Sequence, residues 1–150
     1  MTNDSVADRE LAPITPEVIE IIKKWVPPGG VCEIGAGSGK WIDALQSNGI
    51  PAIGYDTAPG GPNVKYGNHN LAAAHGDKAL LVVWPPDGHI IQEWISAWRG
   101  NIMFLCYNTS RVRFDECLKS WSLKEQLVGL RGRKSGSFFQ VWLRIIPLGK

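Results

Sequence analysis

The stretch that decides the fold is Val31-Cys32-Glu33-Ile34-Gly35-Ala36-Gly37-Ser38-Gly39. Its first four residues, apolar apart from Glu33, predict a short strand, and the glycines that follow stand at alternate positions: Gly35, Gly37 and Gly39. A helix then begins, marked by apolar residues at helical spacing: Trp41, Ile42 and Leu45. Glycines allow the main chain to turn sharply and a ligand to approach it closely. The sequence therefore predicts a ligand site beyond the carboxyl end of this strand.

The spacing of the glycines separates this turn from two other nucleotide-binding turns. The dinucleotide fingerprint requires G-x-G-x-x-G, but the third glycine position is occupied by Lys40. A phosphate-binding P-loop requires Ser or Thr after Gly-Lys, and here Trp41 follows. A nicotinamide-dependent enzyme is therefore the weaker alternative.

Two carboxylates flank the turn. Glu33 stands in a strand that is otherwise apolar, and a buried carboxylate needs partners. It either accepts hydrogen bonds from backbone amides of the turn or organises the loop around a cationic or amine-bearing ligand. Asp56 ends the second expected strand, where a carboxylate can accept both hydroxyls of a ribose. The alternative for Asp56 is an ordinary cap or turn residue before Thr57.

Helices and strands alternate along the rest of the chain. Thr15 as N-cap and Pro16 in the first helical position begin a helix that ends before Pro27. Parallel strands are expected at five ranges: 31–34, 50–56, 63–66, 79–84 and 102–107. Further helical segments are expected at four: 40–48, 71–74, 87–99 and 114–121. The last two strands, 123–130 and 138–146, flank a basic turn and form an antiparallel hairpin.

This order predicts an α/β fold with a Rossmann-like, mostly parallel sheet, helices on both faces and a C-terminal antiparallel hairpin. The continuous apolar run 79–84 is typical of a strand that is buried on both faces. Residues 1–12 are expected to form a flexible tail, and residues 13–150 a single domain.

The composition excludes several classes of protein. Hydrophobic residues make up 44% of the chain and charged residues 20%, as in ordinary globular domains. No apolar run approaches the length of a membrane helix, and the polar, acidic start lacks the features of a secretory signal. The three cysteines form no close pair and no spacing typical of metal ligands, which favours a cytoplasmic protein without a metal site.

The charge is unevenly distributed. Residues 1–98 hold 6 Lys/Arg and 11 Asp/Glu, net −5, whereas residues 99–150 hold 10 and 3, net +7. The basic residues are interspersed, which favours a solvated surface. Three of them crowd the hairpin turn, but no aromatic residues interleave with them: Arg131, Arg133 and Lys134. Nucleic acid is therefore disfavoured as a partner.

Taken together, the E-x-G-x-G-x-G element, the helix after it and Asp56 resemble the class I S-adenosylmethionine-dependent methyltransferases. The run Leu80–Pro86, with Trp84-Pro85-Pro86 at its end, resembles the fourth motif of a small subgroup that carries Trp-Pro-Pro. The resemblance extends from about residue 14 to 146 and implies a trimmed version of the fold, with S-adenosyl-L-methionine as cofactor.

The resemblance implies a set of cofactor-binding residues. The glycine-turn backbone would lie against the methionine part, Asp56 would bind the ribose, and Tyr66 and Gly67 would lie near the adenine. Trp84 and the two prolines after it would line the transfer site. The complete set is Glu33, Gly35, Ala36, Gly37, Ser38, Gly39, Asp56, Thr57, Tyr66, Trp84 and Pro85.

Methyl transfer requires alignment of the acceptor and exclusion of water, with a base only where the acceptor loses a proton. Asp87 is the candidate base, or else an N-cap. Tyr107 and Asn108 could orient the acceptor, or else pack a loop. His69 and His89 are alternative bases. The tryptophans are interpreted as core at positions 94 and 98, and as either core or cleft wall at Trp41.

These features predict a methyltransferase that acts on a small molecule at O, N or S, because 150 residues leave little room for a recognition domain. A homodimer is compatible with this prediction. The alternative is a non-catalytic module that binds S-adenosylmethionine or S-adenosylhomocysteine and needs a partner subunit.

Overall fold

The computed structural model describes residues 14–72, 74–83, 88–107, 116–130 and 137–148. Helical segments are, in chain order, α2 (Pro16–Trp25), α3 (Lys40–Ser47), α4 (His69–Ala72), α5 (Gly88–Ala97) and a 3-10 turn, η1 (Cys117–Ser120). The strands are β1 (Val31–Ile34), β2 (Ala52–Asp56), β3 (Val64–Tyr66), β4 (Ala79–Val83), β5 (Ile102–Tyr107), β6 (Trp121–Leu130) and β7 (Ser137–Arg144).

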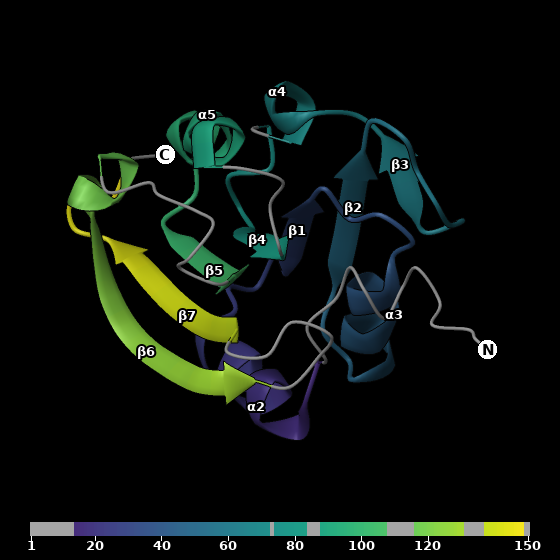
Figure 1. The fold of residues 1–150 in the computed structure, drawn as a ribbon, viewed down its shortest axis with the longest axis horizontal. Coiled ribbons are helices and arrows are strands. Elements are labelled where there is room, and N and C mark those ends of the chain that lie inside the picture. Colours follow the sequence, from purple (N-terminus) through teal and green to yellow (C-terminus); the bar gives the residue numbers. More distant parts are fainter. Residues whose placement is uncertain (1–13, 73, 84–87, 108–115, 131–136, 149–150) are drawn as a thin grey trace.

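The strands form one sheet in the order β3-β2-β1-β4-β5-β7-β6. The first five in this order are parallel to one another, and β7 runs antiparallel to both β5 and β6. Figure 1 shows α2 and α3 on one face and α4 and α5 on the other. The predicted α/β fold, with its C-terminal antiparallel hairpin, is confirmed.

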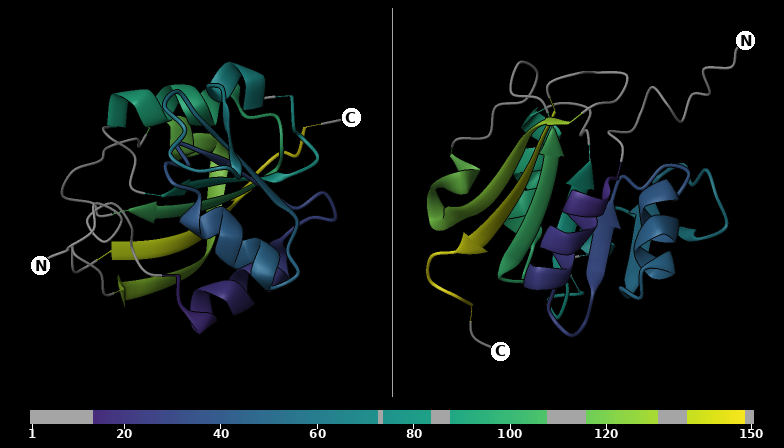
Figure 2. Two further views of the ribbon diagram at one scale, coloured as in Figure 1. Left: turned by 90° about the vertical axis from the view of Figure 1, so that its right-hand side faces the viewer. Right: turned by 90° about the horizontal axis from the view of Figure 1, so that it is seen from below.

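Each face of the sheet carries its own apolar core. Successive strand residues point to opposite faces, so Val31 packs with α2 and α3, whereas Cys32 packs with α5. Every residue of β4 is buried, which fits its position between β1 and β5 under both helical layers. Figure 2 shows α2 and α3 packed next to each other against one face of the sheet.

The first helix begins where its sequence directs. The Thr15 hydroxyl accepts a hydrogen bond from the Val18 N–H at 3.2 Å, which satisfies one of the free amides of the first turn. Val18, Ile19 and Ile22 form the buried face of α2. The helix ends at Trp25, before the two prolines.

Several expected boundaries differ from the structure; β2 begins at Ala52 rather than at 50, and β7 ends at Arg144 rather than at 146. The helix expected at 114–121 is only the single turn η1 in the described part, because Trp121 pairs with Arg144 and begins β6. The turn expected at 71–74 lies earlier, at His69–Ala72. The tail expected at 1–12 lies outside the described residues. No helix in the described part of the chain is long and apolar enough to cross a membrane.

Candidate functional site

The glycine turn joins β1 to α3 with left-handed backbone at alternate residues. The φ angles are +77° at Gly35, +57° at Gly37 and +86° at Gly39, a region that strongly favours glycine. The N–H groups of Gly35 and Ala36 both donate to the Tyr55 carbonyl, at 2.8 and 3.0 Å. These bonds tie the turn to β2 and leave Gly35 exposed at the carboxyl edge of the sheet.

Asp56, at the end of β2, is held by two backbone donors. Its Oδ2 accepts from the Gly37 N–H at 2.9 Å, and its Oδ1 accepts from the Ala58 N–H at 2.8 Å. The second bond is the turn contact that the sequence left open as an alternative. Each carboxylate oxygen has a further lone pair, so the orientation imposed by the turn leaves Asp56 able to accept from a ligand.

A cavity of about 400 Å³ opens beside these two features. Its volume lies within the range of about 300–1,000 Å³ that small-molecule sites occupy. Three residues of the predicted cofactor set line it, namely Gly35, Asp56 and Thr57, and so do two other residues named from the sequence, Gly67 and His69. Tyr66 is 74% exposed and is absent from its lining, whereas the next residue, Gly67, lines it. The other lining residues are Ile34, Asn68, Glu93 and Trp94.

Ala36, Gly37, Ser38 and Gly39 shape the turn but do not line this cavity. Ala36 is buried in the core with α2 and α3, and Gly39 is the N-cap of α3. Within the predicted turn, Gly35 alone therefore borders the cavity, and the other four residues lie behind it. Glu33 does not line the cavity either.

Trp94 is the main residue that the sequence interpretation missed. It was interpreted as core, but it is only partly buried and forms part of the cavity wall. A Cβ placed on Gly35 would lie 3.1 Å from Cη2 of Trp94, so the indole packs directly over the turn. The other two tryptophans interpreted from the sequence lie in the core. The Trp41 ring stacks on Phe139 with 6.3 Å between ring centres, and Trp98 is fully buried.

His69 and Glu93 connect α4 and α5 at the side of the cavity, with Nε2 and Oε1 3.9 Å apart. Neither Asn68 nor Glu93 was singled out from the sequence, because each is a single polar residue with no spacing that marks it. The position of His69 is consistent with a role at the site, and that role stays a prediction.

Glu33 is the one buried carboxylate among the described residues. Its exposed fraction is 1%, and its Oε1 has no hydrogen-bond partner in the described part of the chain. Burial, and to a smaller extent the charge of Asp56, raises the pKa of Glu33 to about 8. The carboxyl is therefore mostly protonated at neutral pH while no ligand is present.

Of the three main residues predicted at the acceptor, Asp87, Tyr107 and Asn108, Tyr107 alone is described; the alternative base His89 lies in the first turn of α5. Tyr107 ends β5, is buried, and packs edge-on against Phe138 at 6.1 Å. The other two lie outside the described residues, as do the residues of the Trp-Pro-Pro motif: Asp87, Asn108, Trp84, Pro85 and Pro86. Within the described ranges, no cluster of three or more His, Cys, Asp or Glu could hold a metal ion.

No family model and no curated protein matches the chain. Solved structures do match it. An uncharacterized protein from Listeria monocytogenes serotype 4b superposes with a TM-score of 0.64 and 13% identity, over 92% of this chain and 71% of that one. A protein from Streptococcus pneumoniae, proposed to be a tRNA (m1A22) methyltransferase, was solved with S-adenosyl-L-methionine. It superposes with a TM-score of 0.62 and 14% identity, over 89% of this chain and 74% of that one. The chain has the fold of Rossmann-like methyltransferases.

An rRNA methylase from Streptococcus thermophilus shares this methyltransferase fold with a TM-score of 0.54 and 9% identity, over 85% of this chain and 94% of that one. This comparison corrects the prediction of a small-molecule acceptor with nucleic acid disfavoured. The small-molecule prediction is wrong because it took a short chain to exclude a large acceptor. An rRNA methylase that this chain spans almost completely shows that the argument from length does not hold. The prediction that disfavours nucleic acid is wrong because it rested on the lack of aromatic residues among the basic ones, which does not decide the acceptor in a fold that RNA methyltransferases share.

Proposed function

We propose that this protein is an S-adenosylmethionine-dependent methyltransferase whose acceptor is a nucleic acid. The observation that carries the proposal is the position of Asp56 in the wall of the cavity. Its carboxylate is oriented by the Gly37 and Ala58 N–H groups, and the exposed Gly35 lines the same cavity. A neighbour with the same fold holds this cofactor.

The residues present fit the cofactor. Gly35 offers bare main chain at the cavity, and the free lone pairs of Asp56 suit two ribose hydroxyls. Glu33 does not line this cavity, because its side chain shares the α2 and α3 face of β1 with Val31. Its predicted role, to organise the loop around a cationic ligand, remains part of this proposal. Thr57, Gly67 and Asn68 would border the adenine side.

When bound, the cofactor supplies a methyl group on a leaving group that is already activated. The protein then has to align the acceptor and exclude water. The Trp94 indole, packed against Gly35, forms the α5 side of the cavity wall and would help to exclude water once the cofactor is bound. The predicted roles of Asp87, Tyr107 and Asn108 concern the acceptor and remain part of this proposal.

The arrangement of the basic residues supports a nucleic-acid acceptor. Tyr107 pairs with Phe138, and Leu130 pairs with Ser137, so the ends of β5 and β6 and the start of β7 lie at the carboxyl edge of the sheet, as the cavity does. The segments that follow β5 and β6 in the sequence, 108–115 and 131–136, contain five basic residues: Arg111, Arg113, Arg131, Arg133 and Lys134. Lysine and arginine attract the phosphates of nucleic acids.

The first test measures cofactor binding. Thermal unfolding of the full chain should shift upward by a few degrees with S-adenosylmethionine and not with NAD, because a ligand stabilises the state it binds. Asp56→Asn should abolish the shift, whereas Asp77→Asn, an exposed aspartate outside the cavity, should preserve it. A wild-type protein without any shift contradicts the proposal.

The second test measures transfer. Tritium from methyl-labelled cofactor should enter total tRNA or rRNA, and ribonuclease should release it. Label that appears in neither RNA nor DNA, while the cofactor still binds, would reject the nucleic-acid acceptor and favour the non-catalytic binding module.

A further inference from the structure

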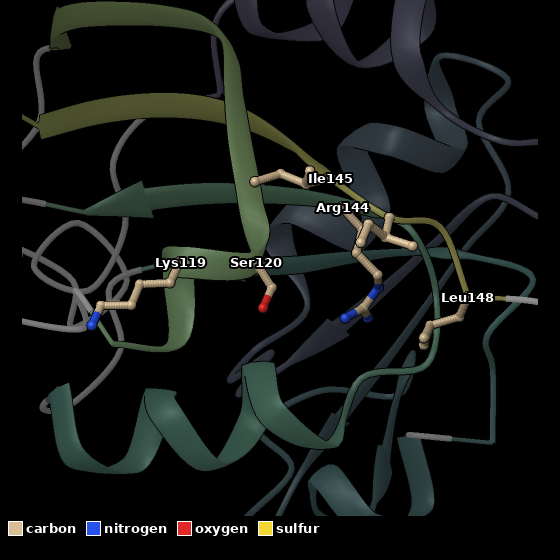
Figure 3. A pocket seen from close by; sticks show the side chains of 6 residues that line it. Lys119, Ser120, Arg144, Ile145 and Leu148 are labelled. Carbon is tan, nitrogen blue, oxygen red and sulfur yellow. The ribbon is translucent and has the colours of Figure 1, made fainter.

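A second cavity of about 410 Å³ lies at the amino ends of the parallel strands, opposite to the first cavity. It forms where β7 ends beside the start of β5, since Ile102 pairs with Leu143. Its lining comes from η1 and from the end of β7 with the residues after it: Lys119, Ser120, Arg144, Ile145, Ile146 and Leu148 (Figure 3). The proposed methyltransferase function makes no use of it.

Arg144 is held rigidly in this cavity by neutral partners. Its Nη2 donates to the carbonyls of Trp98 and Gly100 at 2.9 and 2.7 Å, and its Nε donates to Gly100 at 3.2 Å. The guanidinium carbon lies 4.4 Å from the centre of the Trp121 ring. Among the described residues no acceptor pairs with Nη1, which therefore remains available to a ligand.

The positive charge of Arg144 is not balanced by the described surroundings. Partial burial, and then the nearby charge of Arg99, lowers the pKa of Arg144. No carboxylate in the described ranges forms an ion pair with it, and Lys119 is paired with Glu116 at 2.7 Å. An anion beside Nη1 would remove this imbalance, and an arginine fork suits carboxylate and phosphate groups.

The remainder of the lining is apolar and exposed. Ile145 is 58% and Ile146 is 79% exposed, and Leu148 completes the wall. Covering such side chains is favourable in proportion to the apolar area removed from water. In Figure 3, the Ser120 and Arg144 side chains extend into the same space, so polar and apolar contacts are both available to one ligand.

We propose that this cavity binds a small amphipathic anion, whose carboxylate or phosphate meets Arg144 and Ser120 and whose aliphatic body covers Ile145 and Ile146. The volume is in the range of small-molecule sites. The proposal is independent of methyl transfer, because Arg144 and the first cavity lie at opposite ends of the parallel strands.

Calorimetric titration of the full chain with octanoate, octyl phosphate and octanol tests the proposal. At least one of the two anions should bind with a stoichiometry of one, and their ratio distinguishes a carboxylate from a phosphate ligand. Octanol should bind at least about tenfold more weakly, since a hydrogen bond to a charged group is lost. The Trp121 indole N–H resonance should shift with the anion.

Arg144 also holds the segment between α5 and β5, so its own substitution could unfold the protein. Ile146→Asp places a repelling charge at an exposed position and should weaken anion binding by at least about tenfold. Val128→Asp, at a position on β6 that is 64% exposed and outside the cavity, is the matched control and should stay within about twofold of wild type. Equal binding of octanol, equal loss in both variants, or no binding at millimolar concentration would overturn the proposal.

Discussion

The free energy of unfolding of the Glu33→Gln variant should increase relative to that of wild type as the pH rises. The folded protein holds the carboxyl proton up to a pKa of about 8, whereas the unfolded chain loses it near the ordinary glutamate pKa of 4.5. Between these limits the folded state binds more protons than the unfolded state, so the free energy of unfolding of the wild type falls with rising pH. Glutamine has the shape of the protonated carboxyl and does not titrate.

The magnitude follows from the size of the shift. Within that interval, each pH unit lowers the stability of the wild type by about 1.4 kcal/mol relative to the variant. From about pH 5 to about pH 7 the difference between the two proteins should therefore grow by roughly 3 kcal/mol. A constant change in stability from placing an amide at this position does not alter the dependence of the stability difference on pH.

Urea unfolding followed by the fluorescence of the seven tryptophans measures the difference at each pH. Glu17→Gln, at an exposed position of α2, is the matched control. The pH dependence of the Glu33→Gln difference should exceed that of Glu17→Gln, since only Glu33 is buried. Parallel stability curves for wild type and Glu33→Gln would refute the reasoning, because they would show that Glu33 is equally ionised in the folded and unfolded chain.

Four further results are expected. Gly35→Ala should lower stability by more than Gly49→Ala in urea unfolding, because the two share a φ near +77° but only the Gly35 methyl group would meet Trp94. Trp94→Ala should weaken cofactor binding in calorimetry while leaving the fold intact by circular dichroism, since the indole is only partly buried. Thr15→Ala should cost about 1 kcal/mol of stability in urea unfolding through loss of the helix cap. Cofactor affinity, measured calorimetrically, should rise with pH towards about 8 in wild type and stay flat in Glu33→Gln, because binding of a cation favours the ionised carboxylate.

The sequence was enough to predict those features that depend only on neighbouring residues in the chain. The strand at 102–107 has the predicted bounds, because a continuous apolar run between polar neighbours leaves one interpretation. The cap at Thr15 and the position of Asp56 at the end of β2 were predicted for the same reason. Trp121 was misassigned to a helix because its strand conformation depends on pairing with Arg144, which lies 23 residues further along the chain.

The cavity was harder to predict than the turn behind it. Trp94 shares a helical stripe with Ile91 and Ile95, and periodicity shows which face of a helix turns inward without showing where the core ends. Asn68 and Glu93 lie at the cavity because of how α4 and α5 pack over the end of β1, and that packing follows from long-range contacts. The sequence therefore pointed to the turn and to the cavity residues that follow β2 and β3 and, apart from His69, not to the walls that α4 and α5 contribute.

The two acids that flank the turn differ because of their surroundings. Asp56 borders the cavity and accepts two backbone N–H bonds, which stabilise a carboxylate and fix its direction. Glu33 lies between β2 and β4, where Gly54 and Leu81 are its strand partners, and burial favours its neutral form. The charge of Asp56 adds to that preference, since two neighbouring carboxylates resist joint ionisation.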